Sequence, residues 1–232
     1  LISQLFYIVI VLMFNFLFFS GFLIHNLITF GLTNYIKPEN SRSLSILTNS
    51  VLVSGGSYLF LQNQIPYSTI ANCFQLTLGF YANEILFNKI YNIEKGSNLK
   101  ILHHIIGTIA IWRFPYTGIV VPTLFFSEVS NIPLEIRNIS KREQFNRYYI
   151  QEIMIALLYV SYFYYRIYRS PFQAYDWYQE KMLNNFELCT YISIFSLWIY
   201  WFWKINFVIK KKISNNTNFF LREKFSQLLK NS

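Results

Sequence analysis

Long apolar runs, separated by short polar stretches, recur along the whole chain of 232 residues. A helix needs about 20 mostly apolar residues to cross the hydrocarbon core of a bilayer. Only 13% of the residues are charged, whereas soluble domains carry about 25%. The sequence therefore predicts an all-α, polytopic membrane bundle with spanning helices near residues 5–30, 43–63, 68–90, 99–113, 116–136, 148–168 and 187–209.

The fourth segment is short and ends at Arg113-Phe-Pro115, where the proline stops a helix. The fourth and fifth segments could therefore form one broken unit, so we expect six or seven spanning helices. The first 24 residues lack a basic lead and a small-residue cleavage site, which favours a spanning helix over a signal peptide. We divide the chain into a first helix and loop (1–42), a helical bundle (43–210) and a basic amphipathic tail (211–232) that lies on a membrane surface or a partner.

The basic residues predict an orientation. Sixteen of the 20 Lys and Arg residues lie in or beside the loops after the first, third and fifth segments and in the tail. The opposite side holds only Arg113, Arg166, Arg169 and Lys181. By the positive-inside rule the N-terminus lies outside and the C-terminus inside. The net charge of +9 then reflects topology and anionic headgroups, and no basic patch with a binding motif indicates nucleic acid.

Several common chemistries leave no trace in the sequence. Cys73 and Cys189 both lie in apolar runs without metal-site or redox spacing, so we expect no disulfide and no metal. There is no GxSxG, HExxH or Gly-rich phosphate loop, which removes the commoner hydrolase, zinc-protease and nucleotide-binding hypotheses. We expect no resident cofactor.

Ionisable residues nevertheless lie within the apolar segments, where they are costly and often functional. Under the predicted topology they all lie in the inner half of the membrane: Glu84, His103, His104, Glu128 and Glu152. Helical spacing places further polar residues on the same faces, in three stripes: Thr77, Tyr81, Glu84 and Asn88; Glu128, Asn131 and Glu135; and Glu152, Tyr159, Tyr162 and Arg166. The stripes indicate either a polar cavity or hydrogen bonds between helices.

The histidine pair has two interpretations. Neighbours on a helix point about 100° apart, so His103 and His104 cannot both ligate one metal ion. One of them could act as a base for acyl transfer, oriented by Glu84 or Glu128. The alternative is a satisfied histidine–carboxylate hydrogen bond with no turnover. We expect His25, alone in the first segment, to be a satisfied or interfacial histidine.

Five segments, taken in order, resemble the TLC-domain family, which includes ceramide synthases, translocating-chain-associating membrane proteins and lipid-regulating proteins. Gly79 and Phe80 match its first motif, with Glu84 where Asp is usual. Glu128 and Arg137 match a later motif. The segments are LTLGFYANEI (76–85), ILHHIIGT (101–108), SEVSNIPLEIR (127–137), FYYRIYRSP (163–171) and IYWFWKI (199–205). The resemblance implies a bundle with a lipid-accessible central cavity.

Two departures bear on activity. The family's Ser-x-x-His signature appears here as Ser54 followed by Ser57, and no acidic residue follows the histidine pair until Glu128. The chain is thus more similar to the lipid-regulating branch than to the synthases. Together with the stripes, the resemblance gives these cavity candidates: Ser54, Ser57, Tyr81, Asn131, Arg137, Glu152, Arg166 and Trp201.

Two functions remain open. The first is a non-catalytic membrane protein that binds or senses lipid in an inner-leaflet cavity and serves as an accessory or structural subunit beside other membrane subunits. The second is a ceramide-synthase-like N-acyltransferase that uses acyl-CoA, with His103 or His104 as base and Glu84 or Glu128 as orienting acid. The resemblance implies the endoplasmic reticulum, and the basic, aromatic-rich composition is also compatible with the mitochondrial inner membrane.

Overall fold

The computed structural model describes residues 16–91, 98–113, 125–143, 148–181 and 183–230, and every regular element in these ranges is helical. The all-α prediction is therefore confirmed for this part of the chain. A first helix, Phe16–Gly31, ends in the π-helix η1 (Leu27–Gly31). It is followed by α2 (Pro38–Leu61), α3 (Tyr67–Tyr91), α4 (Asn98–Arg113), the 3₁₀-helix η2 (Ser127–Ser130), α6 (Asn131–Arg142), α7 (Tyr148–Tyr162), the π-helix η3 (Phe163–Arg169), α8 (Ser170–Gln179) and α9 (Asn185–Lys230).

The contacts between helices form a closed ring. Helix α2 contacts α3 on one side and α6 on the other, and α6 contacts α7. The π-helix η3 prolongs α7 and packs on α9, while α4 joins α9 back to α3. The first helix lies outside this ring, against α2 and α3. The ring matters for function because side chains from all its members can converge on one interior space.

Two described helices are long and apolar enough to cross a membrane, namely Pro38–Leu61 and residues Asn185–Lys211 of α9. They correspond to the second and seventh expected segments. Phe16–Gly31 and Leu99–Ile111 are apolar but shorter. The buried apolar core is rich in aromatic and branched side chains, and α3 and α9 contribute most to it, with Ile70, Phe74, Tyr191 and Trp198 among them.

The fifth expected segment, 116–136, differs from the structure. Residues 116–124 and Pro115 lie outside the described residues, and the described part consists of η2 followed by α6, which continues to Arg142. The last turns of α6 are held by polar contacts, since Arg142 donates hydrogen bonds to Glu39 O (2.5 Å) and Asn40 Oδ1 (2.8 Å) at the start of α2. Apolar length alone could not predict this extension.

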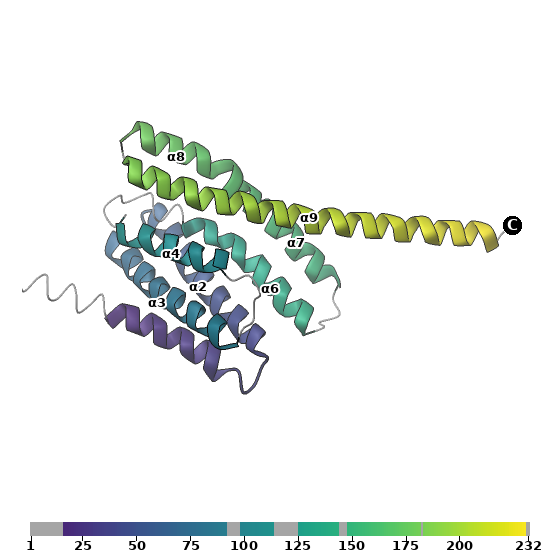
Figure 1. The fold of residues 1–232 in the computed structure, drawn as a ribbon, viewed down its shortest axis with the longest axis horizontal. Coiled ribbons are helices and arrows are strands. Elements are labelled where there is room, and N and C mark those ends of the chain that lie inside the picture. Colours follow the sequence, from purple (N-terminus) through teal and green to yellow (C-terminus); the bar gives the residue numbers. More distant parts are fainter. Residues whose placement is uncertain (1–15, 92–97, 114–124, 144–147, 182, 231–232) are drawn as a thin grey trace, which may run out of the picture.

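The sixth and seventh segments also continue further than expected. Helix α7 passes through the wide turn of η3 into α8, which has Pro171 in its first turn. A proline inside a helix removes one backbone hydrogen bond, and the π-turn lies directly before it. Helix α9 runs unbroken for 46 residues, roughly 69 Å at 1.5 Å per residue, and projects well beyond the bundle (Figure 1). The expected tail from residue 211 is thus a continuation of the last helix.

The first helix approaches α3 closely at two glycines. A Cβ atom built on Gly79 would lie 2.3 Å from Phe22 N and 2.4 Å from Phe18 O, and one built on Gly21 would lie 2.4 Å from Leu76 O. Real Cβ atoms do not approach backbone so closely. Small residues that let two backbones come together are typical of helix pairs in membranes.

We therefore expect Gly79→Ala to separate the first helix from α3 and to cost roughly 1–3 kcal/mol of stability, as overpacking does. The measurement is the temperature at which the detergent-solubilised protein loses its monodisperse peak. Gly55→Ala is the matched control, because a Cβ there meets nothing within 4 Å. Equal melting of both variants would contradict the close helix contact.

Candidate functional site

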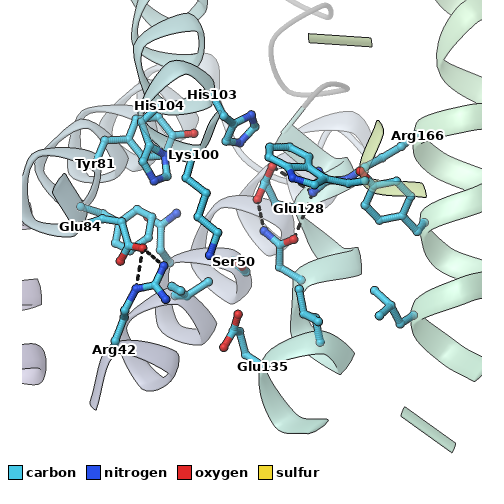
Figure 2. Close-up of a pocket in the computed structure, with 18 of the residues that line it drawn as sticks. Arg42, Ser50, Tyr81, Glu84, Lys100, His103, His104, Glu128, Glu135 and Arg166 are labelled. Atoms are coloured by element: carbon cyan, nitrogen blue, oxygen red, sulfur yellow. Dashed lines mark hydrogen bonds and ion pairs between the residues drawn. The ribbon is translucent and has the colours of Figure 1, made fainter. Parts of the chain in front are cut away.

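A cavity of about 250 Å³ lies inside the ring of helices, and Figure 2 shows its lining. Polar and charged side chains meet apolar walls there. The lining residues are Arg42, Ile46, Asn49 and Ser50 of α2; Phe80, Tyr81 and Glu84 of α3; Lys100, His103 and His104 of α4; Glu128 of η2; Asn131, Leu134 and Glu135 of α6; Leu158 and Tyr162 of α7; Arg166 of η3; and Trp201, Lys204 and Ile205 of α9.

A buried ion pair joins α2 to α3 on one side of the cavity (Figure 2). The Arg42 guanidinium donates to Glu84 Oε1 through Nε at 2.8 Å and also through its terminal NH2 group. Asn88 Nδ2 donates to the same oxygen at 3.1 Å. The second carboxylate oxygen, Glu84 Oε2, is buried without a hydrogen-bond partner. The pair places one neutralised carboxylate and one unsatisfied acceptor at the cavity wall.

A second ion pair joins η3 to η2 on the opposite side (Figure 2). Arg166, of which 2% is exposed, donates to Glu128 Oε1 at 3.2 Å, and to Ser127 O and Asn131 Oδ1 at 3.3 Å each. Its guanidinium carbon also lies 4.9 Å from the centroid of the Tyr162 ring. The Asn131 amide in turn donates to Glu128. Three hydrogen-bond acceptors and one aromatic ring thus fix the position of the Arg166 guanidinium.

The histidines line the cavity between the two ion pairs without contacting either carboxylate through a described hydrogen bond. The ring of His104 lies 4.5 Å from that of Tyr81, and both of its nitrogens are buried without a partner. His103 packs edge-on against Trp201 at 5.2 Å, and its Nδ1 has no partner either. The histidine–carboxylate bond considered in both sequence interpretations is therefore not formed, because each carboxylate binds an arginine instead.

The structure brings together most of the residues named from the sequence. His103, His104, Glu84, Glu128, Tyr81, Asn131, Arg166 and Trp201 all line the cavity. Four other candidates, Ser54, Ser57, Arg137 and Glu152, are not among the residues that line this cavity. The α2 lining residues lie between positions 42 and 50, so Ser54 and Ser57 are one to two turns too far along the helix. Ser54 instead donates to Ser50 O at 2.5 Å.

Sequence reasoning missed the contribution of α2 and of Lys100. Arg42, Ile46, Asn49 and Ser50 follow the spacing i, i+4, i+7, i+8, which marks one helical face and could have been recognised. The predicted topology places Arg42 and Lys100 in or beside inner loops. Arg166 had been counted with the outer loops, yet its side chain is buried in the second ion pair.

Other expectations concern residues outside the cavity. His25 Nδ1 lies 2.7 Å from Ser45 Oγ, so this histidine is satisfied as expected. Cys73 and Cys189 are free thiols. Within the described ranges, no group of three or more His, Cys, Asp and Glu side chains is placed to hold a metal ion.

The second ion pair gives a testable prediction. We expect Arg166→Met to lower stability by roughly 3 kcal/mol, because it leaves the Glu128 carboxylate, whose side chain is only 12% exposed, uncompensated. Combining it with Glu128→Leu restores much of the loss, since two apolar side chains replace the pair. The measurement is thermal unfolding in one detergent, with Arg169→Met, on the exposed side of η3, as control. If the double variant loses as much thermal stability as Arg166→Met alone, the predicted energetic coupling of Arg166 and Glu128 is wrong.

Comparison with known proteins gives one clear result. The family model described as the TLC domain matches residues 40–206, which is more than two thirds of the chain. No curated protein and no solved structure gives a significant match. The matched region covers α2 to the apolar part of α9, so it includes every residue that lines the cavity. The chain therefore belongs to the TLC-domain family of membrane proteins.

Proposed function

We propose that this chain is a multi-pass membrane protein that binds a lipid in the cavity without turning it over. One observation carries this proposal. The two carboxylates that could orient a catalytic histidine, Glu84 and Glu128, are each bound to a buried arginine. A catalytic base is commonly oriented by a third group, and here neither carboxylate hydrogen-bonds a histidine in the described residues. A binding site needs only shape and hydrogen-bonding groups, and the cavity supplies both.

The size and lining of the cavity fit the polar end of a lipid. A volume of about 250 Å³ lies just below the usual range of small-molecule sites, roughly 300–1,000 Å³. It accommodates a headgroup and the first carbons of an acyl chain, while the remaining chain lies along the helices. The branched side chains of Ile46, Leu134, Leu158 and Ile205 provide the apolar part of the wall.

The predicted topology supports an inner-leaflet site. The lining residues lie near the start of α2, the second half of α3, the start of α4 and the part of α9 that leads to the tail. These are the helix ends that the basic residues assign to the inside, with the N-terminus outside and the C-terminus inside. Leu158, Tyr162 and Arg166 are exceptions, because they lie in the outer half of the sixth predicted segment. Arg42 and Arg166 are buried in ion pairs, so neither counts as a loop charge. Leaving them out removes one basic residue from the inner side and one from the outer side, and the excess of basic residues on the inner side remains.

We also propose that the protein serves as an accessory subunit beside other membrane subunits. The support is the length of α9, because an isolated lipid-binding bundle has no need of a helix that extends far beyond it (Figure 1). The endoplasmic reticulum and the mitochondrial inner membrane are the two proposed compartments. Native gels of mildly solubilised membranes distinguish a subunit, which runs in a large particle of fixed composition, from a free monomer.

The second candidate function is the acyl-CoA-dependent N-acyltransferase. It is favoured by the three ring nitrogens of His103 and His104 that are buried without partners in the cavity. For His103 or His104 to work as a base with Glu84 or Glu128 as orienting acid, an arginine would first have to release its carboxylate. That step removes a buried charge from its partner and costs several kcal/mol.

An assay with purified protein separates the two functions. With acyl-CoA and a long-chain amine, we expect no CoA release above background, and native mass spectrometry should find lipid bound to the protein. We expect His104→Leu to fold and to bind lipid about tenfold more weakly. The physical reason is that a buried hydrogen-bonding group contributes about 1.4 kcal/mol or more to binding.

Thr108→Val is the control, since Thr108 lies one turn after His104 on α4, bonds only to the backbone and does not line the cavity. CoA release that disappears in His103→Ala or His104→Ala, with the fold retained, would establish the acyltransferase instead.

A further inference from the structure

One face of α9 carries exposed aromatic and basic side chains in the second half of its apolar run. Trp203 and Phe207 are each 61% exposed, and their ring centroids lie 6.3 Å apart. The ring centroid of Tyr200 lies 6.5 Å from that of Trp203. Lys210 and Lys211, also exposed, follow Phe207 by three and four residues. The five positions are spaced i, i+3, i+7, i+10 and i+11, so they share one helical face, which we call the aromatic–basic stripe.

The length of the apolar run gives the depth of this stripe in a membrane. Asn185–Lys211 comprises 27 residues, roughly 40 Å at 1.5 Å per residue, whereas the hydrocarbon core of a bilayer is about 30 Å thick. Glu187, which accepts a hydrogen bond from the Asn184 N–H at 2.7 Å, marks the polar start of the run. Phe207 lies twenty residues later, roughly 30 Å along the axis. The two lysines therefore follow directly after the hydrocarbon layer, at the depth of phospholipid headgroups.

We propose that the aromatic–basic stripe binds an anionic phospholipid of the inner leaflet, on the outside of the bundle and apart from the cavity. Aromatic side chains are typical of the boundary between acyl chains and headgroups. The exposed rings of Trp203 and Phe207 offer a surface for the first part of an acyl chain. A lysine ammonium presents three donors as a compact charge and suits a phosphate oxygen. The occupant thus combines a negative headgroup with an apolar chain.

No acidic side chain of the protein compensates the two lysines. The sequence of α9 contains no Asp or Glu between Glu187 and Glu223. Among the residues that the structure describes, neither Lys210 nor Lys211 forms an ion pair. The negative leaflet surface attracts lysines that directly follow a spanning helix. A soluble acidic protein could reach the lysines but not Trp203, which lies four residues inside the hydrocarbon layer. The charge and the depth together therefore favour a lipid.

The stripe borders the cavity at Lys204. The Nζ atom of this residue lies 4.7 Å from the centroid of the Tyr200 ring, and the side chain also lines the cavity. Because Lys204 is exposed, it lies at the edge of the cavity rather than inside it. A lipid on the stripe and a lipid in the cavity are therefore neighbours on α9, and variants of different residues distinguish them.

The test measures which lipids the purified full-length protein retains. Delipidated protein in detergent is incubated with an equimolar mixture of phosphatidylglycerol and phosphatidylcholine with identical acyl chains, and native mass spectrometry counts the bound lipids. We expect at least about fivefold preference for phosphatidylglycerol, because one lysine near a membrane surface contributes about 1 kcal/mol. The preference should fall as the ammonium acetate concentration rises, since salt screens exposed charges.

The Lys210→Gln/Lys211→Gln variant should lower the preference for phosphatidylglycerol at least about fivefold, toward equal binding. Lys89→Gln combined with Lys141→Gln is the matched control, because it removes two exposed lysines from α3 and α6 that the predicted topology places on the same side of the membrane. This control should keep the preference. His104→Leu should keep it as well, since that variant weakens only the lipid in the cavity. Failure of the stripe and failure of the proposed function are therefore distinguishable.

Three outcomes overturn the inference. The first is equal binding of the two lipids by the unmodified protein, and the second is an equal fall in the stripe variant and in the control, which would show a response to total charge. The third is an unchanged lipid preference in the stripe variant together with loss of the large particle on native gels. That result would assign the stripe to a membrane protein partner instead.

Discussion

The ion pair between Arg166 and Glu128 is the interaction on which the rest of this site depends. A guanidinium that is 2% exposed inside an apolar bundle persists only if its charge and its N–H groups are matched. Glu128, Asn131 and the Ser127 carbonyl provide the match, and they fix η2 against η3. Because η3 packs on α9 and η2 on α2 and α7, this contact links both sides of the ring and holds the cavity open between them.

The same pairing limits the chemistry. A carboxylate that binds an arginine is a poor partner for a neighbouring histidine, since its charge is already compensated. Arg42 forms an ion pair with Glu84, as Arg166 does with Glu128. The histidine pair therefore lies between two carboxylates whose charge is compensated (Figure 2). What the cavity offers is a lining of polar and apolar side chains, which suits recognition of a lipid headgroup better than proton transfer.

Much of the fold followed from the sequence because apolar length and helical period are local properties. The polar stripe of Thr77, Tyr81, Glu84 and Asn88 is buried, as its spacing on one helix face indicated. The partner of each carboxylate did not follow, because Arg42 and Glu84 are 42 residues apart and only tertiary packing brings them together. From the sequence, Arg42 is expected to be a charged loop residue at the membrane surface. The extension of α6 also depends on a contact between residues far apart in the sequence, the hydrogen bond from Arg142 to Asn40.

The most direct test is an experimental structure of the protein in a lipid nanodisc that contains ethanolamine, choline and anionic phospholipids. The account predicts density for one lipid headgroup in the cavity beside Glu84 and His104, with Arg166 still bound to Glu128. A cavity that holds only water, or a histidine hydrogen-bonded to Glu128 with Arg166 displaced, would contradict it.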